Sequence, residues 1–168
     1  MDWNTETVNI IYASNDGYAG HLAASLYSLL DHNRNIPRMA IYILSVGMSE
    51  AYLERLAGIA GKFCRSLHVA ELGNLRERFD YAVDTRGFDI SAMGRLFAPK
   101  VLPDSVRKAL YLDCDTIVLD DLTGLETFDM QGCPIALVQE PTINHNRLPV
   151  LGLKPESRYF NAGVLLID

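Results

Sequence analysis

Two aspartates, Asp113 and Asp115, stand two residues apart in the otherwise apolar run from Leu110 to Leu119. Such a run predicts a strand, in which alternate side chains point to the same face. The two carboxylates would then lie roughly 6–7 Å apart on one side, with Cys114 pointing to the other. Like charges this close need a cation. Mn²⁺ or Mg²⁺ bound also by phosphate oxygens would supply it, because these metals prefer carboxylate, phosphate and water ligands.

Two other interpretations of the aspartate pair stay open on spacing alone. In the first, a strand ends in an Asp-x-Asp turn whose side chains only bond nearby backbone N–H groups. In the second, the chain is an unrelated doubly wound α/β domain, such as a phosphatase-like fold with an Asp-x-Asp nucleophile strand. That motif normally lies near the first strand, whereas at least three strands are expected before it here, which argues against the second interpretation.

Length and charge restrict the kind of protein. The chain has 168 residues, of which 49% are hydrophobic, so it is long enough for one α/β domain with a sizeable core. Its net charge is −6 and its pI is near 5.1, with no basic patch, so we expect no nucleic-acid partner. An anionic phosphate must therefore be bound locally, through a metal or a well-placed arginine.

Cysteine usage and the lack of targeting signals predict a cytoplasmic protein. The cysteines, Cys64, Cys114 and Cys133, are odd in number and lack metal-like spacing, which indicates reduced thiols. We expect Cys114 and Cys133 to be small buried hydrophobic residues. The first residues do not resemble a signal peptide, and no apolar stretch is long enough for a transmembrane segment.

Apolar runs alternate with helical patterns along the chain. Strands are expected at 8–13, 39–44, 67–70, 109–118, 134–138 and 163–167. Three helices are expected between them: one with the apolar stripe Leu22, Leu26, Leu29 and Leu30, one capped by Ser49, and a short one from Ser91 that Pro99 and Pro103 end. This alternation predicts a mostly parallel sheet with helices on both faces. The polar loop before the last strand is long enough to be a lid or a mobile segment.

The last expected strand is followed directly by Asp168, without a helix to cover it. In a parallel sheet each strand normally leads into a covering helix. We therefore expect either a covering partner or a longer enzyme of which this is the N-terminal part. We also expect apolar surface around residues 164–167 that favours self-association into a homo-oligomer.

Four blocks follow one another along the chain: the opening 12–19, the Gly94-Arg95-Leu96 segment, the aspartate strand 111–118 and the ending 159–167. Together they resemble glycosyltransferase family 8, which includes lipopolysaccharide galactosyl- and glucosyltransferases and glycogenin. The resemblance implies a GT-A fold, a Rossmann-like and mostly parallel sheet, forming one donor-binding domain over residues 1–168. It also implies retaining, metal-dependent transfer of a hexose from UDP-glucose or UDP-galactose to a carbohydrate or lipopolysaccharide acceptor.

The resemblance also implies roles for individual residues. Asp113 and Asp115 match the motif that holds Mn²⁺ or Mg²⁺ against the donor diphosphate. Arg95 matches the arginine that approaches the donor sugar and diphosphate, where its planar fork of donors is suited to phosphate. Without the resemblance, an arginine on a helix would be interpreted as a solvated charge. The other implied donor-binding residues are Ala13, Ser14, Asn15, Asp16, Tyr18, Cys114, Asn161, Ala162 and Gly163, the last allowing close approach of substrate to the backbone.

Three departures from the family pattern affect the expected site. Asn15 stands where many relatives carry Asp, and Gly17 stands where many carry Asn. The late histidine, lysine and Asp-Gln pair of relatives have no counterpart before Asp168, and His145 is interpreted as a surface residue in the polar loop. No catalytic nucleophile is identified. The departures leave a truncated, non-catalytic nucleotide-sugar-binding module as the alternative function.

Overall fold

The computed structural model describes residues 7–85, 87–125, 128–144 and 148–168. In this part of the chain, one six-stranded sheet has the order β3-β2-β1-β4-β6-β5. Its strands are β1 (Val8–Ser14), β2 (Met39–Ser45), β3 (Ser66–Glu71), β4 (Ala109–Leu112), β5 (Ile135–Gln139) and β6 (Phe160–Ile167). The first four run parallel, and β6 is antiparallel to both β4 and β5. The predicted mostly parallel sheet is confirmed.

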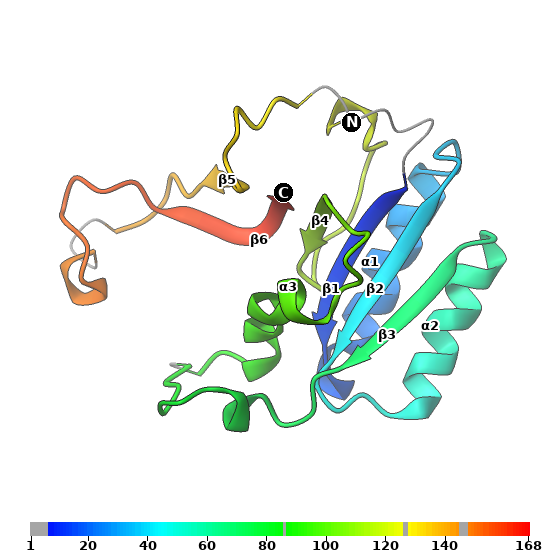
Figure 1. Cartoon of the computed structure of the whole chain (residues 1–168), viewed down its shortest axis with the longest axis horizontal. Coiled ribbons are helices and arrows are strands. Elements are labelled where there is room, and N and C mark those ends of the chain that lie inside the picture. The colour runs from blue at the N-terminus through cyan, green and yellow to red at the C-terminus, as the bar shows by residue number, and fades with distance from the viewer. Residues whose placement is uncertain (1–6, 86, 126–127, 145–147) are drawn as a thin grey trace.

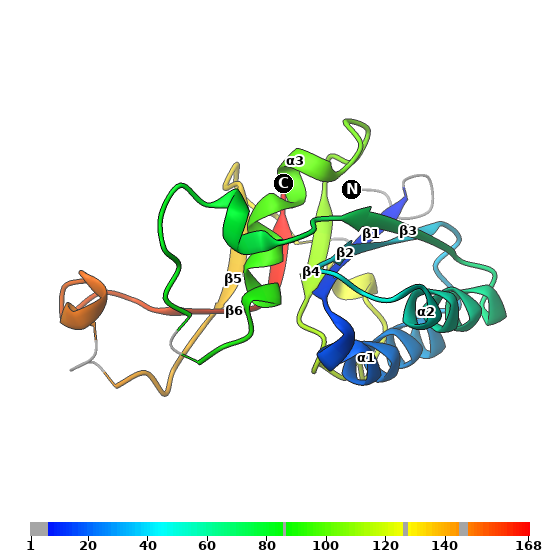
Figure 2. The same ribbon diagram turned by 90° about the horizontal axis from the view of Figure 1, so that it is seen from below.

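Helices cover both faces of the sheet, as predicted (Figures 1 and 2). On one face lie α1 (Ala19–His32) and α2 (Glu50–Lys62). The other face carries α3 (Ala98–Val101) and the 3-10 helix η3 (Ile90–Phe97). Shorter 3-10 helices occur in the connections, at Asp16–Tyr18, Leu75–Arg78, Thr123–Leu125 and Pro149–Leu151.

Each face of the sheet has its own hydrophobic core. The predicted stripe of α1 is buried against Ile10, Tyr12 and Leu110 of the strands. The opposite core joins Tyr111 and Leu165 of the sheet to Phe97 of η3. Strands β1 and β2 are apolar apart from Asn9, Ser14 and Ser45, because both of their faces are covered.

The helical segment after Ser91 differs from the prediction. It begins as η3 and continues as α3, with Pro99 in the first turn of α3. Proline does not end a helix there, because the backbone N–H that it lacks would have no partner in the first turn. The segment ends at Val101, and Leu102 is extended ahead of Pro103, as a residue before proline prefers.

The last strand is less exposed than expected. Val164 is 38% exposed, which agrees with the prediction, but Leu165 and Leu166 are each only 6% exposed. Leu165 packs against the core on the η3 side of the sheet, next to Tyr111, so the prediction was wrong for these two residues. Cys133 is exposed, which also contradicts its expected burial, whereas Cys114 is buried and all three cysteines are free.

The polar loop between β5 and β6 contains the 3-10 helix Pro149–Leu151. His145, predicted to be a surface residue, lies outside the described residues. Among the residues that are described, no helix is long and apolar enough to cross a membrane.

Candidate functional site

A cavity of about 410 Å³ lies where β1 and β4 end and β6 begins. In open α/β sheets, ligands bind outside the carboxyl ends of the parallel strands, so its position is that of a binding site. All but three of the predicted donor-binding residues line it; the exceptions are Ser14, Asn15 and Asp16. Nine of the twelve predicted donor-binding residues, which are far apart in the chain, therefore lie together around one cavity.

Asp113 and Asp115 both line the cavity, but a turn rather than a strand carries them. Strand β4 ends at Leu112, and the Asp113 N–H still bonds the Gly163 carbonyl at 2.7 Å, which extends the ladder by one bond. The Thr116 N–H then bonds the Asp113 carbonyl at 3.2 Å and closes a turn. The predicted strand was therefore too long. Strand alternation does not set the direction of the Asp115 side chain, because Asp115 lies in the turn.

Hydroxyl groups from helix α1 hold this turn in place. The Thr116 hydroxyl donates to the Asp113 carbonyl at 2.8 Å and lies 3.0 Å from the Ser25 hydroxyl, which in turn lies 3.1 Å from the hydroxyl of Tyr12. Because each hydroxyl has one proton, the donors run in one direction, from Tyr12 to Ser25 to Thr116 to Asp113. Further along, the Val118 N–H donates to Ser28 at 3.0 Å. The aspartate turn is thus fixed against the buried face of α1.

Arg95 is a largely buried cation at the centre of the cavity wall. Its side chain is 14% exposed, and its Nη2 atom lies 2.9 Å from Asp113 Oδ1. Its Nε atom donates to the Ala92 carbonyl at 2.7 Å, and Nη1 donates to the Ala162 carbonyl. The interpretation of Arg95 as a solvated charge is wrong, since one side chain ties η3, the aspartate turn and the start of β6 together.

Tyr111 lies beneath this ion pair. The Arg95 guanidinium carbon is 4.6 Å from the centre of the Tyr111 ring, a cation–π contact. The Tyr111 hydroxyl donates to Asp113 Oδ1 at 2.7 Å. Burial, and then the neighbouring Asp113 charge, raise the pKa of Tyr111 far above its usual value. The hydroxyl therefore keeps its proton and acts as a donor at neutral pH.

Cys114, between the two aspartates, points away from them. Its thiol donates to the Ala13 carbonyl of β1 at 3.2 Å. Burial raises the pKa of Cys114 to about 11, although a hydrogen bond from Ser14 acts in the opposite direction. Cys114 is therefore protonated at neutral pH and packs the turn against β1, and it is neither a thiolate ligand nor a nucleophile.

The start of β6 forms the opposite wall of the cavity with Asn161, Ala162 and Gly163. The Gly163 N–H donates to Asn161 Oδ1 at 2.7 Å. A Cβ atom at Gly163 would lie 2.9 Å from Asp113 Oδ2 and 3.0 Å from Asn161 Oδ1. Glycine is needed here because the Asp113 carboxylate occupies the space that a side chain would take.

The opening turn after β1 contributes fewer residues to the cavity than predicted. Tyr18 lines the cavity, but Asp16 accepts a hydrogen bond from the Ser49 N–H at 2.7 Å and thus points toward the start of α2. Ser14 is fully buried at the end of β1. The sequence could not show this, because Asp16 and Ser49 come together only when β1 and β2 pair in parallel and end at the same edge of the sheet.

Asn15 joins two of the elements that surround the cavity. Its Oδ1 atom accepts from the Tyr18 N–H at 3.3 Å, and its Nδ2 atom donates to Asp89 Oδ1 at 2.9 Å. Asp89 also accepts from the Ser91 N–H at 2.8 Å and so caps η3. Burial disfavours the Asp89 charge, but the hydrogen bonds from Ser91 and Asn15 outweigh it, and the pKa of Asp89 lies below its usual value.

This contact gives a physical reason for asparagine at position 15. We expect Asn15→Asp to lower the free energy of unfolding by about 1–2 kcal/mol, because it places a second carboxylate against Asp89. The reciprocal double variant, Asn15→Asp with Asp89→Asn, restores a donor between the two side chains and should regain most of this loss. Urea denaturation of the two single variants and the double variant measures the coupling. If the double variant loses as much stability as the two single variants together, the contact between Asn15 and Asp89 contributes nothing to stability.

Several cavity residues were not predicted from the sequence. They are Phe88, Asp89, Ser91, Ala92, Met93, Tyr111 and Tyr159. Asp89 carried a usable signal, since an aspartate just before a helical segment is a typical N-cap. The contribution of Phe88, which is 75% exposed, had no comparable signal in the sequence.

The carboxylates of the turn suit a hard divalent cation. Within the described residues, no cluster of three or more His, Cys, Asp or Glu side chains could hold a metal. The available protein ligands are the two carboxylates of Asp113 and Asp115. Phosphate oxygens and water would complete the shell, a set that Mg²⁺ and Mn²⁺ accept. The residues present therefore fit such an ion if a phosphate ligand accompanies it.

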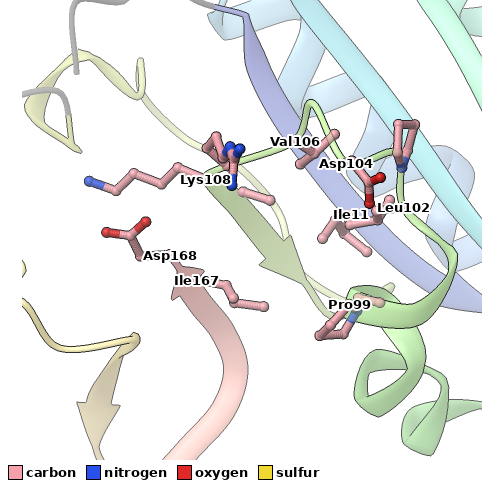
Figure 3. A pocket seen from close by; sticks show the side chains of 12 residues that line it. Ile11, Pro99, Leu102, Asp104, Val106, Lys108, Ile167 and Asp168 are labelled. Carbon is pink, nitrogen blue, oxygen red and sulfur yellow. The ribbon is translucent and has the colours of Figure 1, made fainter.

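A second hollow, of about 380 Å³, lies at the start of β4 and the end of β6 (Figure 3). The apolar side chains of Ile11, Leu102 and Ile167 line it, together with charged residues such as Lys108 and Asp168. None of the predicted donor-binding residues, all of which the structure describes, contributes to it. The chemistry therefore concentrates in the first cavity.

Comparison with known proteins assigns the chain to a family. The model of Glycosyl transferase family 8 matches residues 9–168. General stress protein A of Bacillus subtilis (strain 168) is 27% identical over 164 residues, which cover 97% of this chain and 56% of that protein. Lipopolysaccharide 1,2-glucosyltransferase of Escherichia coli (strain K12) is 23% identical, over 98% of this chain and 48% of that protein. The chain spans about half the length of the curated relatives it matches.

Solved structures show the same fold. The crystal structure of the galactosyltransferase LgtC with donor and acceptor sugar analogues has a TM-score of 0.77 and 25% identity, covering 96% of this chain and 58% of that one. Mouse xyloside xylosyltransferase 1 has a TM-score of 0.63 at 16% identity, over 96% of this chain and 67% of that one, a likeness of fold alone. The sheet and its helices thus form a GT-A-like fold, and the chain belongs to glycosyl transferase family 8.

Proposed function

We propose that the chain binds UDP-glucose or UDP-galactose together with Mn²⁺ or Mg²⁺ and serves a retaining hexosyltransferase acting on a carbohydrate or lipopolysaccharide acceptor. One observation carries the proposal. The two aspartates, the buried cation Arg95 and the glycine-containing wall at Gly163 converge on one cavity at the carboxyl ends of parallel strands. Family membership supports a glycosyl donor for that cavity.

The residues around the cavity have different roles in binding. Asp113 and Asp115 would hold the metal, which when bound neutralises charge on the leaving diphosphate. Arg95 balances the charge of Asp113 before the ligand arrives. The backbone of Gly163 lets the carboxylate and the ligand approach the wall closely. Tyr18, Phe88 and Tyr159 supply aromatic surface on which a planar base can stack.

Calorimetric titration of UDP with and without Mn²⁺ tests the proposal. We expect binding only with the metal, because the carboxylates repel the diphosphate in its absence. Asp115→Ala should abolish this binding. Asp120→Ala removes an exposed carboxylate from the same segment and is the matched control, expected to bind as the wild type does. Equal UDP affinity in EDTA would contradict the proposed metal role.

A non-catalytic nucleotide-sugar-binding module is the second candidate. It is favoured by the finding that the described residues form no metal-binding cluster of three or more His, Cys, Asp or Glu side chains. Incubation with UDP-glucose and UDP-galactose separates the two functions. A transferase should release UDP and free or transferred sugar, whereas a binding module should retain metal-dependent UDP binding and release neither.

A further inference from the structure

We infer that the Tyr111 hydroxyl is a positioning group for the metal ligand Asp113. It holds one carboxylate oxygen, Oδ1, so that the other, Oδ2, stays available to a divalent cation in the cavity. The inference rests on the proposed function, because it concerns the metal-binding role of Asp113. Tyr111 itself does not contact the metal.

The contacts of the Asp113 carboxylate are unequal. Oδ1 accepts from the Tyr111 hydroxyl at 2.7 Å and lies 2.9 Å from Arg95 Nη2. Among the described residues, no protein donor is bonded to Oδ2. That oxygen lies beside Gly163, close enough that a Cβ atom there would be 2.9 Å away. The carboxylate is therefore held with one oxygen engaged and one free.

Tyr111 is itself held firmly, so its hydroxyl can fix the carboxylate. The residue is 1% exposed and sits in the middle of the sheet, paired with Ile11 of β1 and Leu165 of β6. The Arg95 guanidinium covers its ring at 4.6 Å. Tyr111 and Asp113 are two residues apart and meet on one side of β4 because the ladder continues to the Asp113 N–H.

Arg95 alone cannot fix the orientation of the Asp113 carboxylate. A bidentate pair with a carboxylate uses two guanidinium nitrogens, but Nε and Nη1 of Arg95 are bonded to the Ala92 and Ala162 carbonyls. Only Nη2 reaches the carboxylate, and it contacts Oδ1 alone. A carboxylate held at one oxygen by one donor can still rotate about its Cβ–Cγ bond, and the Tyr111 hydroxyl adds the second donor that fixes it. Arg95 therefore supplies charge, and Tyr111 sets the orientation.

The test measures Mn²⁺ binding to the Tyr111→Phe variant by electron paramagnetic resonance, in the presence of saturating UDP. Phenylalanine keeps the ring under Arg95 and removes only the hydroxyl. We expect Mn²⁺ affinity to fall by about tenfold or more, as for loss of other groups that orient a metal ligand. The matched control is Tyr42→Phe, on the same sheet face but beside a hollow near the start of β1. It should bind Mn²⁺ as the wild type does.

The outcomes separate this inference from the proposed function. If wild-type protein with UDP binds no Mn²⁺, both fail. If the wild type binds Mn²⁺ and Tyr111→Phe binds it equally well, only the positioning role is overturned. Thermal melting followed by circular dichroism supplies the second readout. A Tyr111→Phe protein that no longer folds would show a structural hydroxyl and would also overturn the positioning role.

Discussion

Arg95→Ala is expected to lower the free energy of unfolding by about 2–3 kcal/mol and to weaken metal-dependent UDP binding at the same time. The guanidinium bonds backbone carbonyls of Ala92 and Ala162 and pairs with Asp113, so its loss loosens three elements together. It also leaves the partly buried Asp113 carboxylate without its cation. Urea denaturation and calorimetric UDP titration with Mn²⁺ measure the two effects.

Two further variants show which property of Arg95 is responsible. Arg38→Ala removes an exposed arginine just before β2 and should leave both stability and UDP binding unchanged. Arg95→Lys keeps the charge but not the planar fork, so it should fall between the wild type and alanine. If Arg95→Ala is as stable as the wild type and has lost only UDP binding, Arg95 does not hold the three elements together. If it loses stability but binds UDP unchanged, Arg95 does not contribute to UDP binding.

The aspartate pair shows how far residue spacing can predict a site. The types and spacing of Asp113 and Asp115 left a metal site and a simple turn equally open, and the family resemblance favoured the metal site; in the structure both residues line the cavity. Their backbone was predicted wrongly because an apolar run does not reveal where its ladder of hydrogen bonds stops. That point depends on Gly163, which supplies the last carbonyl, and on Ser25 of α1, which holds Thr116. Both partners lie far away in the sequence.

The direction of the last strand was equally hidden. The apolar run of residues 163–167 predicts a strand, but side-chain alternation is the same for parallel and antiparallel neighbours. In the structure β6 runs antiparallel to β4, which brings its first residues, rather than its last, to the cavity. This is why Asn161 to Gly163 face the aspartate turn.

Contacts between loops that are far apart in the chain could not be predicted from the sequence. Asn15 and Asp89 are both polar residues at the start of short helical turns, and each would be expected to cap its own turn. Each does so, and a further bond between their side chains joins the two turns. Only the packing of η3 on β1 makes that bond possible, and Gly94 sets how closely the two elements approach.

Gly94→Ala is expected to destabilise the protein by about 1–3 kcal/mol, because overpacking a close contact costs this much. A Cβ atom at position 94 would lie 2.9 Å from the Cβ atom of Ala13 and 3.3 Å from Cδ1 of Leu72. Ala13 is a buried strand residue that cannot move aside, so η3 must shift away from the sheet. That shift displaces Arg95, the next residue, and metal-dependent UDP binding should weaken as well.

The same substitution elsewhere should have the opposite effect on stability. Gly20 lies in α1, and a Cβ atom there would have no neighbouring heavy atom within 4 Å. Gly20→Ala should therefore stabilise the protein by about 0.5–1 kcal/mol through helix propensity alone. Urea denaturation of the two variants tests the pair. A Gly94→Ala protein as stable as the wild type would show that η3 tolerates displacement. Close packing at Gly94 would then not be what holds Arg95 over Tyr111.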